Sequence, residues 1–134
     1  MYTGLTITMT TPAALNFASI TPADSTTNVQ TNYALALTFS QTHYSGDSVI
    51  LTIPSTISLN TGFACTTTSV GLSVTCIKQS TQVLEITINI TNNSTWNYTS
   101  AAIVISNMQN NWYAGSFSFN IQTTTNDTAT TYYV

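Results

Sequence analysis

Five Asn-x-Ser/Thr tripeptides give this sequence its clearest chemistry, because this tripeptide accepts N-linked glycans. Four of them fall within nine residues, and the fifth lies far downstream. The acceptor asparagines are Asn89, Asn92, Asn93, Asn97 and Asn126. A chain rich in Asn, Ser and Thr also produces such tripeptides by accident, so chance is the alternative explanation. The clustering favours covalent N-glycans, and no other cofactor is expected.

Catalytic chemistry has little support in the sequence. His43, Ser45 and Asp47 fall within one loop, but a Ser/His/Asp triad needs rigid supports that three residues of one loop do not easily provide. The carboxylates are too dispersed for a glycosidase pair or a calcium loop; they are Asp24, Asp47, Glu85 and Asp127. A single His and two Cys do not make up a metal site. We therefore predict no catalytic, cofactor-binding or metal-binding residues and no enzyme.

Two aromatic pairs could contact sugars. Trp96 and Tyr98 lie inside the cluster of glycan acceptors, and Trp112 and Tyr113 lie in an Asn-rich segment. Their flat rings would suit a lectin-like stacking platform. In the alternative that we prefer, one ring of each pair caps the core and the other covers the first sugar of a neighbouring glycan.

The two cysteines indicate a disulfide. Cys65 and Cys76 flank a turn at Ser69, Val70 and Gly71, and a hairpin there would bring them opposite each other. On the chain-entropy account, so short a closed loop stabilises the fold by about 3 kcal/mol. Two free buried thiols are the alternative.

The composition limits the classes of protein. The chain has 134 residues, enough for one domain with a hydrophobic core, but only 4% of them are charged, against about 25% in ordinary domains. One Lys, no Arg and a net charge of -3 argue against nucleic-acid binding. No apolar run is long enough to span a membrane. The N-terminus lacks the features of a signal peptide, which indicates a mature chain or a piece of a longer one. With so few ionisable groups, we expect stability to be insensitive to pH.

Apolar residues alternate with polar ones in most segments, which predicts strands. In the strand from Val83, apolar residues occupy every second position from Leu84 to Ile90, and Asn89 points away from the core. Strands or extended segments are also expected at 2–10, 15–20, 33–39, 49–53, 57–59, 63–66, 72–76, 102–106, 117–121 and 128–134, with a long loop at 107–115. No helical periodicity persists. The pattern predicts an all-β, antiparallel Ig-like β-sandwich of about 7–10 strands.

The first strand stands apart in this prediction. Residues 1–12 form an N-terminal strand whose apolar face is Leu5, Ile7 and Met9, and residues 13–134 form the sandwich. The strand could pair within its own sheet or be donated to the open edge of a neighbouring module. The sequence alone leaves both arrangements open.

Residues 21–40, TPADSTTNVQTNYALALTFS, resemble the opening of bacterial-type Ig-like repeats. The matching positions are Pro22, Asp24, Asn28, Val29, Leu37, Phe39 and Ser40. SGDSVILTIP and NMQNNWYAGSFSFNIQT also resemble segments of modules repeated in large surface proteins of microbes and protists. This resemblance implies spacers or adhesive stalks without catalytic residues. The scarcity of charge and the glycan acceptors depart from the pattern and suggest a eukaryotic or archaeal setting.

Two functions follow as hypotheses. The first is a structural subunit or repeat module of an N-glycosylated filament or coat, extracellular or at the cell surface, whose partners are copies of itself or neighbouring tandem modules. The strand-like sequences YTGLTITMT and ATTYYV near the two ends support it. The second is a carbohydrate-binding or adhesive module that uses the exposed aromatics.

Overall fold

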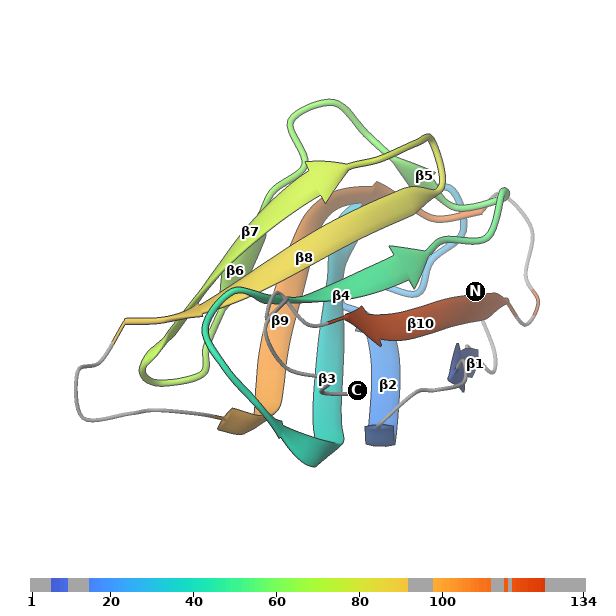
Figure 1. Ribbon diagram of the computed structural model, residues 1–134. Helices are drawn as coiled ribbons and strands as arrows, with labels where there is room; N and C mark the ends of the chain where they lie inside the picture. The colour runs from blue at the N-terminus through green and yellow to red at the C-terminus, as the bar shows by residue number, and fades with distance from the viewer. Residues whose placement is uncertain (1–5, 10–14, 92–97, 112–114, 116, 125–134) are drawn as a thin grey trace.

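The computed structural model describes residues 6–9, 15–91, 98–111, 115 and 117–124 (Figure 1). These residues form ten strands in two sheets and no helix, which confirms the all-β sandwich. The strands are β1 (Thr6–Met9), β2 (Leu15–Pro22), β3 (Gln30–His43), β4 (Asp47–Thr52), β5 (Ser58–Leu59), β6 (Cys65–Thr67), β7 (Leu72–Lys78), β8 (Val83–Ile90), β9 (Tyr98–Gln109) and β10 (Ser118–Thr124). The strand predicted at 128–134 lies outside the described residues.

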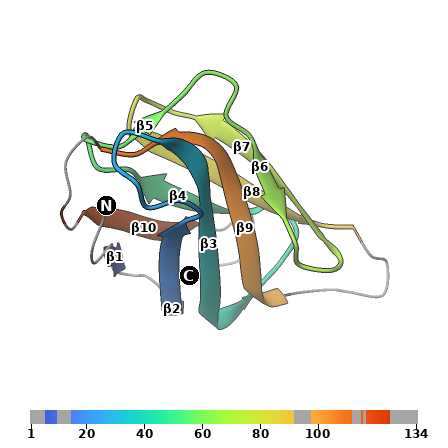
Figure 2. The ribbon, with the colours of Figure 1, turned by 180° about the vertical axis from the view of Figure 1, so that it is seen from behind.

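The first sheet has the order β1-β10-β4-β8-β7, and the second has the order β2-β3-β9-β5, with β6 also pairing with β9. In Figure 1 the first sheet runs obliquely across the second, and Figure 2 shows the second sheet from behind. Every strand pair is antiparallel except β1 with β10, which is parallel. One side of the sandwich is therefore bounded by β1 and β2, and the other by β7 and β6.

The core lies between the sheets and is made by the alternating residues that the sequence indicated. On β3, the side chains of Tyr33, Leu35, Leu37 and Phe39 are all buried. On the facing sheet, the buried apolar residues are Val49, Leu51, Leu84, Ile86, Ile88, Phe119 and Ile121. The rings of Tyr33 and Phe119 meet across the two sheets with centroids 6.1 Å apart. Burial of these apolar side chains is the main force that holds the sheets together.

β9 extends beyond its predicted end. Asn107, Met108 and Gln109 belong to this strand, so the prediction of a loop from 107 to 115 was wrong for them. Asn107 has a φ of 61° and lies where the register with β3 shifts, because Ser106 and Asn107 of β9 oppose the single residue Asn32 of β3. This bulge interrupts the alternation in the sequence, yet Met108 returns to the core and is fully buried.

The N-terminal strand β1 is the end strand of the first sheet. Ile7 and Met9 pair in register with Phe119 and Ile121, the two fully buried residues of β10. Leu5, the third residue assigned to this strand's apolar face, lies outside the described residues. Among the described residues, β10 is the only hydrogen-bonded neighbour of β1.

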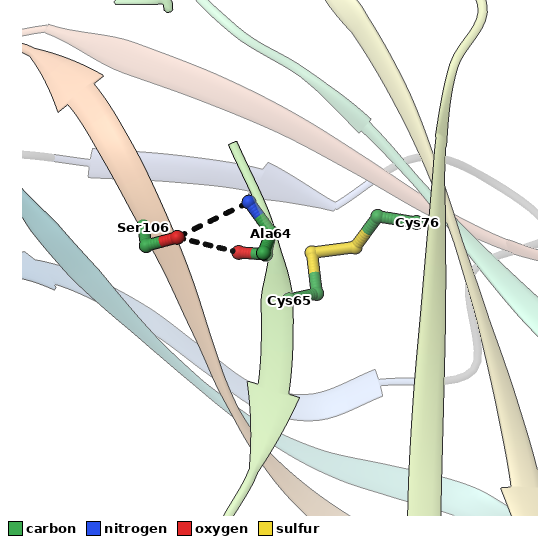
Figure 3. The surroundings of a disulfide bond; sticks show 4 residues. All are labelled: Ala64, Cys65, Cys76 and Ser106. Carbon is green, nitrogen blue, oxygen red and sulfur yellow. Dashed lines mark hydrogen bonds between the residues drawn. A yellow bond between two sulfur atoms is a disulfide. The ribbon is translucent and has the colours of Figure 1, made fainter. Parts of the chain in front are cut away.

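The disulfide between Cys65 and Cys76 is present, with Cα atoms 5.8 Å apart. The two cysteines are not brought together by a hairpin, as the sequence had suggested, because β6 pairs with β9 and β7 pairs with β8. The bond therefore joins the edge strands of different sheets and closes one side of the sandwich (Figure 3). Next to it, the Ser106 hydroxyl of β9 accepts the Ala64 N–H at 3.1 Å and donates to the Ala64 carbonyl at 3.2 Å. These contacts hold the start of β6 against β9.

Candidate functional site

Of the predicted glycan acceptors, the structure places Asn89. It lies on β8 opposite Ser73 of β7, between the buried Ile88 and the partly buried Ile90. Its half-buried side chain is on the face away from the core, as the alternation predicted. Asn92, Asn93, Asn97 and Asn126 lie outside the described residues.

The proposed stacking platform has to be corrected at Tyr98. The platform needs this ring exposed, but Tyr98 is only 7% exposed, which agrees with the preferred alternative that one ring of the Trp96 and Tyr98 pair caps the core. It begins β9 in register with His43, and its ring packs edge-on against Phe39 with centroids 5.8 Å apart. Tyr98 therefore fills one end of the core and offers no face to a sugar. Trp96, Trp112 and Tyr113 lie outside the described residues.

A buried His43–Asp47 pair occupies the same end of the sandwich. The turn from Tyr44 to Asp47 joins β3 to β4 and contains Gly46 at a φ of 94°. It places Asp47 Oδ2 3.0 Å from His43 Nδ1, and the same oxygen accepts the Tyr44 N–H at 3.0 Å. The Ser45 hydroxyl instead accepts the Ile90 N–H at 2.9 Å. The structure thus brings His43 and Asp47 together and engages Ser45 elsewhere.

The surroundings of His43 favour its neutral form. Its ring is 1% exposed and lies against Phe39 and Tyr98, with centroids 4.3 and 5.7 Å away. Burial lowers the pKa of His43, and the nearby Asp47 carboxylate only partly opposes this. Its Nε2 atom has no hydrogen-bond partner among the described residues. Burial also raises the pKa of Tyr98, and the negative charge of Asp47 adds to that effect.

Stability should consequently depend on pH, against the expectation from composition. The pKa of His43 is lower in the folded than in the unfolded chain, so the unfolded chain binds more protons as the pH falls below 6.5. We expect His43 to cause no loss of stability above that pH. Below it, the free energy of unfolding should fall by at most about 1.4 kcal/mol per pH unit. The measurement is the melting temperature between pH 7 and pH 5.

His43→Asn is the matched control, because its Nδ2 takes the place of the His43 Nδ1 atom and can still donate to Asp47, but the amide does not titrate. The wild type should lose stability relative to this variant as the pH falls. If the melting temperatures of the two proteins changed with pH in parallel, the pH dependence could not be attributed to His43.

A network of amide side chains lies at the opposite end of β3. Gln109 Nε2 donates to Asn28 Oδ1 at 3.3 Å, and Asn60 Nδ2 donates to Gln109 Oε1 at 3.2 Å and to Gln30 Oε1 at 3.3 Å. Gln30 Nε2 in turn donates to Asn107 Oδ1 at 2.9 Å. Sequence analysis did not identify this cluster. Its one signal was the density of Asn and Gln at 28–32 and 107–111.

Asn110 anchors this end to the core. It is 2% exposed, and its Oδ1 accepts the Tyr33 hydroxyl at 2.6 Å. Its Nδ2 donates to the carbonyls of Asp24 and Thr26 at 2.8 and 2.7 Å. One side chain thus ties the segment between β2 and β3 to the end of β9.

The described part of the chain contains no group of three or more His, Cys, Asp or Glu residues placed to hold a metal ion. None of its segments is a helix long and apolar enough to cross a membrane. No protein-family model matches the chain, and neither the curated proteins nor the solved structures contain a significant match to it.

Proposed function

We propose that this chain is a structural module of an N-glycosylated extracellular filament or cell-surface coat, assembled by strand pairing between neighbouring modules. The observation that carries the proposal is β1, a four-residue strand that ends the first sheet and pairs only with β10 among the described residues. The module would be of the Ig-like repeat type that residues 21–40 resemble.

The position of β1 supports strand exchange. The next strand along the chain, β2, belongs to the other sheet, so β1 is linked to its own sheet by a single ladder. The same strand from a second copy would present the same residues in the same register to Phe119 and Ile121. Exchange of an identical strand therefore replaces the lost contacts with the same ones. Repeated exchange along a series of copies produces an open chain.

Two further features support an extracellular setting. The Cys65–Cys76 disulfide is compatible with a secreted protein, because such bonds persist in oxidising compartments. The scarcity of charge leaves hydroxyls, amides and attached glycans to hydrate the surface.

Engineered cysteines test the strand exchange. Thr8 and Asn120 are register partners in β1 and β10, and neighbouring strands lie about 4.8 Å apart, within disulfide range. We expect the double variant Thr8→Cys/Asn120→Cys, oxidised at high protein concentration, to give a ladder of covalent oligomers on non-reducing gels. A covalently closed monomer would show that β1 stays in its own sheet, and would overturn the proposal.

Mixing single variants supplies the control. Thr8→Cys chains mixed with Asn120→Cys chains should form heterodimers. Thr8→Cys chains mixed with Thr75→Cys chains should not, because Thr75 is exposed on β7 at the far edge of the sheet. Deletion of residues 1–12 should also abolish assembly, so a shortened chain that assembles like the intact one would contradict the proposal.

A further inference from the structure

Two adjoining hollows open at the amide-rich end of the sandwich. The smaller, of about 300 Å³, is lined by Asn28, Thr56, Ser58, Gln109 and Asn110. The larger, of about 400 Å³, shares Ser58 and is otherwise lined by Ser55, Ile57, Leu59, Lys78, Thr81 and Gln82. Both volumes fall at the lower end of the range of small-molecule sites, about 300–1,000 Å³. Apart from Lys78, every polar side chain that lines them is an uncharged amide or hydroxyl.

The amide network fixes the orientation of the side chains in the smaller hollow. Both ends of the Gln109 amide are engaged, by Asn28 on one side and Asn60 on the other. The Asn28 oxygen is used by Gln109, which leaves the Asn28 Nδ2 group without a partner among the described residues. The backbone of Asn28 is held as well, because its N–H donates to the Asn111 carbonyl at 2.7 Å. The site is therefore largely preformed.

The unused hydrogen-bonding groups define the ligand. Around the smaller hollow they are the Asn28 amide donors and the hydroxyls of Thr56 and Ser58, a mixed set of neutral donors and acceptors. An apolar ligand would bury these groups without hydrogen-bond partners, which would weaken its binding. A phosphate or nucleotide would find only one cation, Lys78, and no second positive charge. A ligand that carries several neutral hydroxyls satisfies the site best.

We propose that the two hollows bind a short neutral oligosaccharide. One sugar ring occupies the smaller hollow against Asn28 and Gln109, and the next lies across Ser58 in the larger one. There the exposed Ser55 and Thr81 offer further hydroxyl groups to the sugar, whereas Ile57 and Leu59 are buried in the core. This site differs from the aromatic platform of the sequence hypothesis, and it does not depend on strand exchange. It would give the module a second role, adhesion to glycans.

The test uses the full-length chain, oxidised and free of its own glycans, with uniform ¹⁵N labelling. Hexasaccharides of glucose, mannose and N-acetylglucosamine are titrated while the side-chain amide signals are followed by NMR. We expect at least one of them to shift the Asn28 and Gln109 amide signals in a saturable manner. Saturable shifts confined to other regions, or no shift at millimolar sugar, would overturn the proposal.

Variants test the assignment. Asn28 has a φ of 58°, a conformation that glycine adopts without strain, so Asn28→Gly removes the amide and keeps the backbone. This variant should bind the same hexasaccharide about fivefold more weakly, since one hydrogen bond contributes about 1 kcal/mol. Gln122→Ala, an exposed amide on β10 of the other sheet, should bind like the wild type.

Three outcomes would overturn the assignment. One is an affinity of Asn28→Gly within twofold of the wild type. The second is binding of acidic sugars alone, abolished by Lys78→Gln. The third is a preference for unglycosylated peptides over sugars.

Discussion

Replacing Asn110 by alanine should destabilise the domain by about 3 kcal/mol, because the change removes three hydrogen bonds at a buried position, each contributing about 1 kcal/mol. Asn110 is the only described side chain that joins the Tyr33 hydroxyl to the carbonyls of Asp24 and Thr26. Without it, the segment between β2 and β3 loses these side-chain hydrogen bonds and keeps only backbone ones, such as that from the Asn28 N–H to the Asn111 carbonyl. Urea unfolding followed by circular dichroism measures the loss.

Two further variants make the result specific. Gln122→Ala changes an exposed amide on β10 and should cost less than about 0.5 kcal/mol, as most surface changes do. Tyr33→Phe removes only the hydroxyl, so a double-mutant cycle with Asn110→Ala should give a clear coupling energy. A stability of Asn110→Ala equal to that of Gln122→Ala would show that the buried amide has no special part in the fold.

Removing the disulfide should have an effect of similar size. The variant Cys65→Ser/Cys76→Ser loses the constraint on a short loop, for which the chain-entropy account predicts about 3 kcal/mol. It also releases β6 from β7, so one side of the sandwich is no longer held by a covalent bond. The free energy of unfolding should fall accordingly, with the secondary structure retained at low temperature.

Reduction of the wild type gives an independent check of this prediction. Dithiothreitol should lower the stability of the wild type to that of the double variant and leave the variant unchanged. Val70→Ser, which alters the 95% exposed tip of the loop that the disulfide closes, should have little effect. A loss below about 1 kcal/mol in the double variant would mean that the β6 and β7 edges hold together without the bond.

The strands were predictable because each buries one face. Tyr33 to Phe39 and Leu84 to Ile88 alternate, and the large apolar side chains at every second position of both runs are buried. The disulfide was predictable from spacing, but its setting was not. Two cysteines around a turn suggest a hairpin, whereas here the chain crosses from one sheet to the other between β6 and β7. Which sheet a strand joins depends on partners far away in the sequence.

The polar sites were harder to predict from the sequence. His43 and Asp47 were noticed as neighbours in a loop, but only the packing of Phe39 and Tyr98 shows that the pair is buried. The role of Asn110 depends on Tyr33, which lies 77 positions away in the chain. The hydrogen bonds of the amide network likewise join residues far apart in the sequence, such as Asn28 in the turn before β3 and Gln109 of β9. Local sequence patterns do not predict such long-range contacts.

The parallel ladder between β1 and β10 has a mechanical consequence. β1 is the first strand of the described chain and β10 is the last, and they run side by side in the same direction. Tension that pulls β1 toward its N-terminal side and β10 toward its C-terminal side slides the two strands past each other. The hydrogen bonds of the ladder then bear the load together instead of opening one after another. A module built in this way resists tension along its chain best at the point where β1 and β10 meet.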